Sequence, residues 1–242
     1  MDRVKVFIDD KVKIPEKKYR SLVAPCLAEV LGTATLMFIG CMGCIVDIYN
    51  TKVIQFAPLT FGLAVGMAVQ MFGHISGAHL NPAVTIAAII MNKIDWLLVP
   101  FYFVSQLIGA LVGYGLIMIV TPGQLNSEVC VTAVHPLLED YQGLIIETIL
   151  TAMLVLLVCS TWDGRLASKT ESVSIRLGLL LAGMFLATSQ FTGASINPVR
   201  SLSPAIYHNS WKAHWIYWVG PIVGSIVGAF SYKYAFYQEH AD

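Results

Sequence analysis

Apolar residues fall into six long runs along the chain, separated by shorter polar segments. The predominantly apolar runs cover residues 22–46, 56–72, 96–120, 144–160, 177–191 and 215–236. A helix of about 17 to 25 apolar residues crosses a hydrocarbon core of about 30 Å. The pattern therefore predicts six membrane-spanning helices. The first run follows a charged segment with no clear cleavage-site pattern, so we interpret it as a span and not as a secretory signal.

The composition agrees with a membrane protein and suggests an orientation. The 242 residues are 56% hydrophobic and 12% charged, with a mean hydropathy of +0.69, whereas a soluble domain has roughly 25% charged residues. Basic residues gather ahead of the first run, and the loop at 121–141 has none. Because positive charge marks the cytosolic side, we expect both termini there. Residues 1–20 and 238–242 would be cytosolic tails of a single domain over 21–237.

Two polar segments interrupt the apolar pattern and resemble each other. "SGAHLNPAVT" at 76–85 and "TGASINPVRS" at 192–201 share a small residue, Gly-Ala, an apolar residue and Asn-Pro. Glu29 and Glu147 also recur in similar surroundings, in the first and fourth runs. The chain therefore contains a duplication, with one repeat over about 21–121 and the other over about 141–237. Three spans in each repeat give the second repeat the opposite orientation in the membrane.

Each Asn-Pro pair marks the start of a short helix. Asn is favoured as a helix N-cap, and Pro is tolerated at the first helical position because its missing N–H is not needed there. The segments 81–92 and 197–209 would extend ~16 to 20 Å at about 1.5 Å per residue, or half a bilayer. They enter from opposite sides in an inverted repeat and can meet midway. Such broken backbone at membrane depth indicates a water-filled pore.

The remaining polar residues exclude several classes of protein. The net charge is zero, from 15 basic and 15 acidic residues, so we expect no nucleic-acid partner. The sequence offers no plausible set of catalytic residues, and we expect neither an enzyme nor a cofactor. No Cys or carboxylate stands at ligand spacing from His79, which we interpret as bracing its loop and not as binding a metal. Cys130 alone lies in a long loop, so a disulfide framework is not expected.

These motifs closely resemble those of the aquaporin (major intrinsic protein) family over residues 20–237. The first box is Asn81, Pro82 and Ala83; the second is Asn197, Pro198 and Val199, where the family usually has Ala. The resemblance implies an all-α membrane fold of six tilted transmembrane helices plus two re-entrant half-helices in an inverted-repeat hourglass. It also implies a multi-pass protein of the plasma membrane, assembled as a homotetramer with one pore in each subunit.

The resemblance also implies a selectivity filter. Arg200 stands at the family's filter-arginine position and Phe61 at its aromatic position. Phe185 stands where water-selective members usually carry His, and Ala194 where a mercury-reactive Cys is often found. A branch of insect aquaporins that lost this His resembles the present pattern, including the Asn-Pro-Val-Arg-Ser run, and its members conduct glycerol as well as water.

The function that this resemblance implies is a passive water channel driven by osmotic gradients. Asn81 and Asn197 would each cap a half-helix through the side-chain oxygen and point their amide N–H groups at one passing water molecule. The positive ends of both half-helices would oppose cations and hydronium. The expected partners are therefore water, small uncharged solutes and the lipid bilayer.

The solute range stays open, because the sequence markers disagree. Phe185 would remove a hydrogen-bond donor from the filter and could admit glycerol or urea in addition to water. Ser201 directly after the filter arginine, together with the aromatic pair Tyr217–Trp218, resembles the water-conducting type instead. An aquaglyceroporin-like channel is therefore the principal alternative.

Two buried acids and a histidine also have more than one interpretation. Glu29 and Glu147 could relay protons in a coupled transporter. The favoured interpretation makes them structural acceptors for the N–H groups of the loops that enter the half-helices. His74 could line the cytosolic vestibule or serve in packing. A junction protein with a closed pore is a weaker alternative.

Overall fold

The structure, a computed structural model, describes residues 16–45, 56–123, 125, 128–166 and 171–238. Its longer helices are α1 (Glu16–Met42), α2 (Ala57–Ser76), α3 (Pro82–Ile90), α4 (Val99–Val120), α5 (Asp140–Thr161), α6 (Val173–Thr192), α7 (Pro198–His208) and α8 (Ile216–Ala235). The 3-10 turns η2 (Trp96–Leu98) and η3 (Gly164–Leu166) adjoin α4 and α5. Most of the basic N-terminal tail lies outside the described residues.

The long helices match the predicted spans, and α1, α2, α5 and α6 extend beyond the apolar runs at one end or both. Within the described residues, α1, α2, α4, α5 and α6 have both the length and the apolar composition to cross a membrane. Helix α8 has 20 residues, the same number as α2 and α6, although its tyrosines and Lys233 make it more polar. Helix α5 begins at Asp140, before the apolar run at 144, because Glu139 and Gln142 form a reciprocal capping box at its start.

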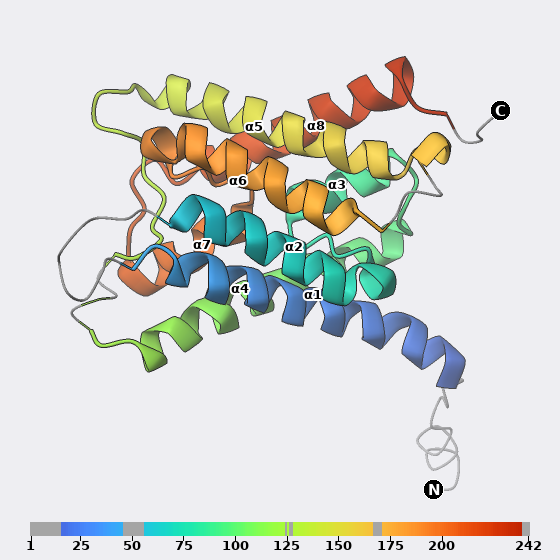
Figure 1. Cartoon of the computed structure of the whole chain (residues 1–242), viewed down its shortest axis with the longest axis horizontal. Helices are drawn as coiled ribbons and strands as arrows, with labels where there is room; N and C mark the ends of the chain where they lie inside the picture. Colours follow the sequence, from blue (N-terminus) through green and yellow to red (C-terminus); the bar gives the residue numbers. More distant parts are fainter. Residues whose placement is uncertain (1–15, 46–55, 124, 126–127, 167–170, 239–242) are drawn as a thin grey trace, which may run out of the picture.

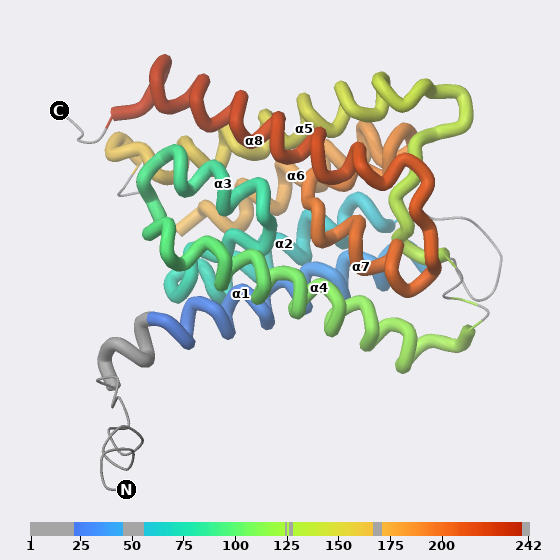
Figure 2. Tube along the Cα trace, turned by 180° about the vertical axis from the view of Figure 1, so that it is seen from behind, coloured from blue at the N-terminus to red at the C-terminus, as the bar shows by residue number. Residues whose placement is uncertain are grey.

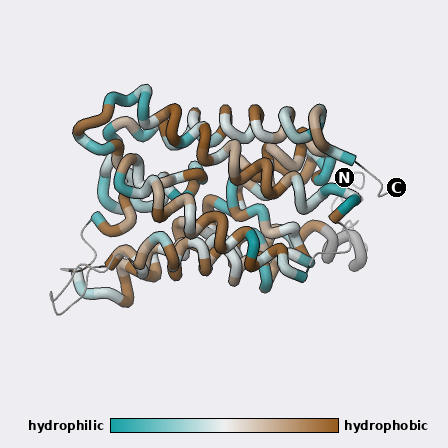
Figure 3. The backbone as a smooth tube through the Cα atoms, turned by 45° about the horizontal axis from the view of Figure 1, so that its top comes forward, coloured by the Kyte–Doolittle hydropathy of each residue, from teal (hydrophilic) through white to brown (hydrophobic). Residues whose placement is uncertain are grey.

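The long helices run side by side, and the start of α1 and the end of α8 lie at the same end of the bundle (Figure 1). The short helices α3 and α7 occupy opposite ends of the bundle and lie between α4 and α8 (Figure 2). Hydrophobic colours spread along the helices, while the connections at either end are mostly hydrophilic (Figure 3). The all-helical arrangement is thus the predicted one of long spans around two half-length helices.

The two repeats pack their helices through equivalent glycines. A Cβ atom on Gly109 would lie 2.3 Å from the carbonyl oxygen of Val30, and one on Gly224 would lie 2.3 Å from that of Thr148. No side chain fits at either position, so α4 crosses α1, and α8 crosses α5, at close range. The duplication seen in the sequence therefore extends to the helix contacts that hold each repeat together.

Candidate functional site

A cavity of about 100 Å³ lies where the two repeats meet. Its wall contains the predicted polar residues Asn81, Asn197 and Arg200, together with apolar side chains such as Val65 and Leu181. A single water molecule needs on the order of 10–15 Å³ of such space, so the cavity has room for a short file of waters. The apolar wall offers few competing hydrogen bonds, which leaves the polar groups to orient whatever occupies it.

The two box asparagines have matching roles at the starts of α3 and α7. Asn81 has an extended backbone, and its side-chain oxygen accepts from the N–H of Ala83 at 2.9 Å. Asn197 does the same with the N–H of Val199 at 3.2 Å. In each case a proline occupies the first turn of the helix. Both short helices therefore start as the sequence predicted, with the positive ends of their dipoles at the cavity.

The same asparagines also join the two repeats. The side-chain amide of Asn81 donates to the carbonyl oxygen of Ile196 at 2.8 Å, and that of Asn197 donates to the carbonyl oxygen of Leu80 at 2.9 Å. An amide group carries two N–H donors, and each of these bonds uses one of them. One N–H of each asparagine is left for a molecule in the cavity, while the other N–H fixes the direction in which the amide points.

The backbone before each box adopts the same left-handed conformation in both repeats. Gly77 and Gly193 have φ of 83° and 80°, and the non-glycine residues Leu80 and Ile196 have φ of 54° and 57°. Residues with a Cβ rarely adopt a positive φ, and such backbone persists only when its surroundings hold it. The carbonyl groups that receive the asparagine amides belong to these constrained loops.

Glu29 supplies part of this support for the first loop. Its carboxylate accepts from the hydroxyl of Ser76 at 2.7 Å, the N–H of His79 at 2.8 Å, the N–H of Leu80 at 2.7 Å and the amide of Gln106 at 2.8 Å. The side chain is completely buried. These contacts fit the favoured interpretation, in which the acid is a structural acceptor for loop N–H groups.

Glu147 has the equivalent place in the second repeat. Its carboxylate accepts from the hydroxyl of Thr192 at 2.7 Å, the N–H of Ser195 at 2.9 Å and the N–H of Ile196 at 2.8 Å. It is also completely buried. A buried carboxylate that accepts several N–H and O–H bonds is well compensated, and here each acid fixes the backbone of one half-pore loop.

Arg200 lies on the first turn of α7 and is 4% exposed. One terminal nitrogen of its guanidinium donates to the carbonyl oxygen of Cys130 at 2.8 Å, and the other donates to that of Gly193 at 3.4 Å. The guanidinium carbon lies 4.7 Å from the ring centroid of Phe61. Two carbonyls and an aromatic face therefore hold this cation beside the cavity.

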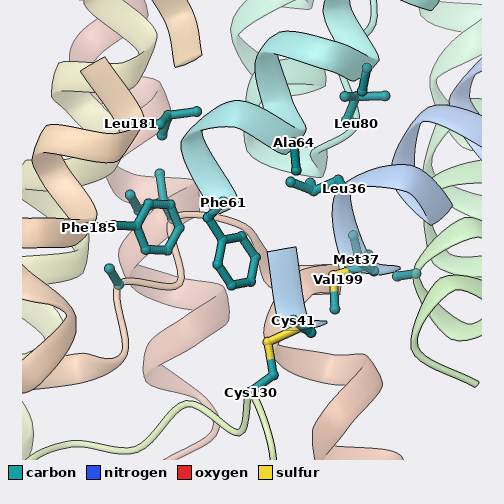
Figure 4. Close-up of a cluster of buried hydrophobic side chains, with 14 of the residues drawn as sticks. Leu36, Met37, Cys41, Phe61, Ala64, Leu80, Cys130, Leu181, Phe185 and Val199 are labelled. Atoms are coloured by element: carbon teal, nitrogen blue, oxygen red, sulfur yellow. A yellow bond between two sulfur atoms is a disulfide. The ribbon is translucent and has the colours of Figure 1, made fainter. Parts of the chain in front are cut away.

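Phe61 and Phe185 lie together beside the guanidinium. Their ring centroids are 4.8 Å apart and their planes differ by 14°, an arrangement close to parallel stacking. Figure 4 shows the two rings facing each other, with the sulfur bridge of Cys41 and Cys130 below Phe61. The structure thus brings Phe61, Phe185 and Arg200 to one cross-section of the cavity wall.

The other candidate residues lie in different surroundings. Ala194 is buried with a φ of 47°, and it is not among the described residues that line the cavity. His74 is exposed on the last turn of α2, also outside that lining. His79 is buried and does line the cavity, with its Nδ1 3.1 Å from the hydroxyl of Thr85. Within the described part of the chain, no cluster of three or more potential metal ligands occurs.

The expectation about cysteines was wrong. Cys41, near the end of α1, and Cys130, in the connection between α4 and α5, form a disulfide. Sequence reasoning expected no disulfide framework because Cys130 alone lies in a long loop. The available signal was topological: the end of the first span and the loop at 121–141 lie on the same predicted side, so these two cysteines can meet.

The segment around Cys130 is a further part of the site that sequence reasoning missed. The hydroxyl of Tyr114 donates to the carbonyl oxygen of Val129 at 2.6 Å. Thr132 donates from its hydroxyl to that of Ser201 at 2.7 Å. The segment is thus attached to α4 and α7 on either side of Cys130, whose own carbonyl accepts from Arg200. No local motif indicates this, because a chain segment far from the boxes supplies the contact.

Comparisons with known proteins agree with this geometry. The family described as Major intrinsic protein matches residues 16–232. Aquaporin-4 of Rattus norvegicus is 42% identical over 178 residues, which are 74% of this chain and 55% of that protein. Aquaporin-2 of Rattus norvegicus is 36% identical over 210 residues, which are 86% and 77% of the two chains. The present chain therefore spans about half the length of the aquaporin-4 relatives.

A solved structure with the same arrangement is the X-ray structure of the aquaglyceroporin from Plasmodium falciparum. It superimposes with a TM-score of 0.78 at 29% sequence identity, and the match covers 88% of this chain and 96% of that one. The match therefore includes nearly the whole of the compared chain.

Proposed function

We propose that this chain, which belongs to the major intrinsic protein family, is a passive water channel driven by osmotic gradients. Membership of this family of channels makes the chain a multi-pass integral membrane protein and not an enzyme. Its relatives at 36% to 42% identity carry the name aquaporin. The single observation that carries the proposal is the pair of asparagine amides, anchored across the repeats, at the facing starts of two half-helices.

That pair supports conduction of water without protons. The free N–H groups of Asn81 and Asn197 can both donate to the oxygen of one water molecule, whose own hydrogens then point away along the file. A water held in this way cannot accept a proton from its neighbour, so the hydrogen-bonded chain is interrupted. The positive ends of α3 and α7 add a field that opposes cations and hydronium at the same point.

The wall at Arg200 supports exclusion of ions at a second point. Its buried guanidinium repels cations, and its N–H groups offer donors to passing water. The rings of Phe61 and Phe185 beside it carry no hydrogen-bond donors, so an anion finds little compensation there for the loss of its hydration shell. Uncharged molecules avoid both penalties.

A second candidate function is conduction of glycerol or urea as well as water. The stacked rings of Phe61 and Phe185 support it, because they present an apolar face on which a carbon chain could slide. In a filter with His at the second position, that face would carry a donor for water instead. The resemblance to the insect aquaporins that lost this His favours the same alternative, which concerns the range of solutes and not the class of protein.

The coupled-transporter alternative has less support. Neither Glu29 nor Glu147 is among the described residues that line the cavity. Both carboxylates accept several hydrogen bonds from the loops that enter α3 and α7. A proton carrier would need to reach the transport path and exchange partners, whereas these acids hold the backbone at fixed points.

Osmotic shrinkage tests the proposal directly. Purified protein in liposomes is mixed with a hypertonic solution of an impermeant solute in a stopped-flow instrument, and light scattering gives the water permeability. Glycerol and urea gradients follow on the same vesicles, and an enclosed pH dye measures proton flux. We expect fast water flux and no added proton flux relative to empty liposomes. Water permeability equal to that of empty liposomes would exclude the channel.

We further propose a homotetramer in the plasma membrane with both termini in the cytosol. The family resemblance and the basic tail support this arrangement. Exposed apolar side chains cover the outward faces of α1 and α5, including Leu27, Leu31, Ile145 and Ile149. Lipid or a second subunit must cover such faces. Light scattering of the detergent-solubilised protein during size-exclusion chromatography distinguishes a tetramer from a monomer.

A further inference from the structure

The disulfide between Cys41 and Cys130 has no part in the function proposed above, yet it lies next to Arg200. We infer that this disulfide is a positioning element for the filter: it holds the carbonyl group of Cys130 against the Arg200 guanidinium and so limits the size of the solutes that pass. The inference rests on the proposed channel function, because it concerns the selectivity of that same pore.

The first argument is that Cys130 contacts both α1 and the Arg200 guanidinium. Its sulfur is bonded to Cys41, which is completely buried in α1. Its carbonyl oxygen accepts from a terminal nitrogen of Arg200 at 2.8 Å. Only the atoms of one residue separate the covalent link from the hydrogen bond, so the disulfide restricts the position of this acceptor more directly than any contact elsewhere in the segment.

The second argument is the backbone conformation of Cys130. Its φ is 66°, in the left-handed region that a residue with a Cβ seldom adopts. Such a conformation persists only where the surroundings impose it. Without the link to Cys41, the backbone at residue 130 can relax to a negative φ, and that change rotates the neighbouring peptide groups. The carbonyl that faces Arg200 would then turn away from it.

The third argument is that the turn of α1 that carries Cys41 also supports the other side of the filter. A Cβ on Gly40 would lie 2.6 Å from ring atoms of Phe61, so the ring packs directly on the helix backbone. The hydroxyl of Thr60 lies 3.3 Å from the carbonyl oxygen of Gly40. In Figure 4 the disulfide lies below the ring of Phe61. One turn of α1 therefore fixes the position of the Phe61 ring by packing. The same turn fixes the position of the Arg200 guanidinium through the disulfide to Cys130.

Loss of the link leaves Arg200 with weaker restraints. Its contact with the carbonyl oxygen of Gly193 is long, at 3.4 Å, and its Nε has no hydrogen-bond partner among the described residues. The face of Phe61 holds a cation without fixing its direction. A guanidinium freed from Cys130 can swing along the wall, and the opening beside Phe61 and Phe185 widens. Because glycerol is larger than water, a wider opening raises the permeability to glycerol more than the permeability to water.

The segment itself stays attached when the disulfide is removed. Tyr114 still holds the carbonyl oxygen of Val129, and Thr132 still donates to Ser201. Variants without the disulfide can therefore fold and insert, which makes the inference testable on selectivity and not only on stability.

The test compares Cys41→Ser, Cys130→Ser and the double variant with the wild type in liposomes. We expect the ratio of glycerol to water permeability to rise severalfold in all three. The double variant should match the single ones, because each removes the same bond. Cys159→Ser is the matched control: it removes another buried cysteine, one with a free thiol, and should leave the ratio unchanged.

Chemical reduction provides a reversible form of the same experiment. Dithiothreitol delivers two electrons and two protons to the disulfide, which becomes the thiols of Cys41 and Cys130, while the reagent closes into its cyclic disulfide. Mass spectrometry of alkylated peptides measures the extent of reduction. Reduced wild type should have the raised ratio of the double variant, reoxidation should restore the low ratio, and the double variant should not respond.

Several results would overturn the inference. One is an unchanged permeability ratio in serine variants that insert normally, even if their melting temperature falls, since that outcome is expected of a purely structural disulfide. Another is the finding that both cysteines are free thiols in the purified wild type. If reduction does not reach the buried bond, the serine variants alone decide. Wild-type liposomes that conduct no water would instead contradict the proposed function itself.

Discussion

In the proposed channel, single residues determine which molecules pass the cavity, and most of these residues could be named from the sequence. Asn81, Asn197 and Arg200 lie in the two Asn-Pro motifs, and Phe61 could be named from the family resemblance. Two further features could not be found in this way: the mutual orientation of the rings and the carbonyl acceptors of Arg200. A side-chain orientation depends on neighbours that are distant in the chain, so no local pattern encodes it.

The substitution Phe185→His tests the apolar half of the filter. The imidazole would bring a hydrogen-bond donor into a wall that now consists of two stacked rings, and it would remove the face on which a carbon chain can slide. We expect glycerol permeability to fall severalfold while water permeability is retained. Stopped-flow measurements with both gradients on the same vesicles check this, and equal glycerol permeability in the two proteins would contradict it.

The substitution Glu147→Gln tests support of the loop before the second box. The new amide group would present a donor to the N–H groups of Ser195 or Ile196, which now donate to the carboxylate. An unpaired buried polar group costs about 1–3 kcal/mol, so we expect a lower melting temperature and reduced water permeability. The matched control is Glu171→Gln at an exposed position. If Glu147 instead carries protons, proton flux will change while the melting temperature does not.

At the scale of elements, the apolar pattern predicts the helices well and their ends less well. The hydropathy of residues 144–160 marks the part of α5 inside the membrane, but its first turn is polar and depends on the capping box of Glu139 and Gln142. Glycine spacing likewise indicates that helices pack closely without saying which partner they meet. The pairs α1 with α4 and α5 with α8 emerge only in the folded structure of each repeat.

The contact between α5 and α8 supports a prediction about glycine replacement. A Cβ in Gly224→Ala would lie 2.3 Å from the carbonyl oxygen of Thr148, and backbone cannot move aside as a flexible side chain can. Overpacking of this kind costs about 1–3 kcal/mol. We expect a lower melting temperature and less tightly folded protein. Gly183→Ala is the control, because a Cβ there meets no atom within 4 Å, and an equal loss in both variants would refute the explanation.

The cysteines support a prediction that concerns the elements lining the pore. Of the described residues that line the cavity, none is a cysteine, and the disulfide removes Cys41 and Cys130 from thiol chemistry. We therefore expect water permeability to be insensitive to mercuric chloride under oxidising conditions. Strong inhibition would indicate that Cys26, Cys44 or Cys159 lies closer to the water path than the structure has it. The corresponding serine variants would identify which one.

At the scale of the whole molecule, the duplication explains why the sequence predicts so much of the site. An inverted repeat relates Glu29 to Glu147 and Asn81 to Asn197, so each half of the pore can be inferred from the other. The elements without an equivalent in the other repeat were the ones missed. The disulfide is one of them, since Cys41 in the first repeat pairs with Cys130 in the connection between repeats.

Another set of contacts joins the end of α5 to the C-terminal segment. Asp163 follows α5, and its buried carboxylate accepts from the side chain of Arg165, the hydroxyl of Tyr232 and the N–H of Gln238. The hydrogen-bonded Arg165 guanidinium holds the pKa of Asp163 well below its usual range. The stability contributed by this carboxylate is therefore fully present above its unfolded-state pKa of about 3.9 and is lost as pH falls through the depressed folded-state pKa.

Replacement of Asp163 should consequently lower stability by a similar amount throughout the neutral range. We expect Asp163→Asn to reduce the melting temperature equally at pH 6, 7 and 8, because the wild-type carboxylate stays ionised at all three. The difference between the two proteins should narrow only in strong acid, where protonation weakens the same contacts in the wild type. Thermal unfolding monitored across this pH series, with Glu171→Gln as the exposed control, checks the prediction. A difference that grows toward low pH would contradict the sign of the pKa shift.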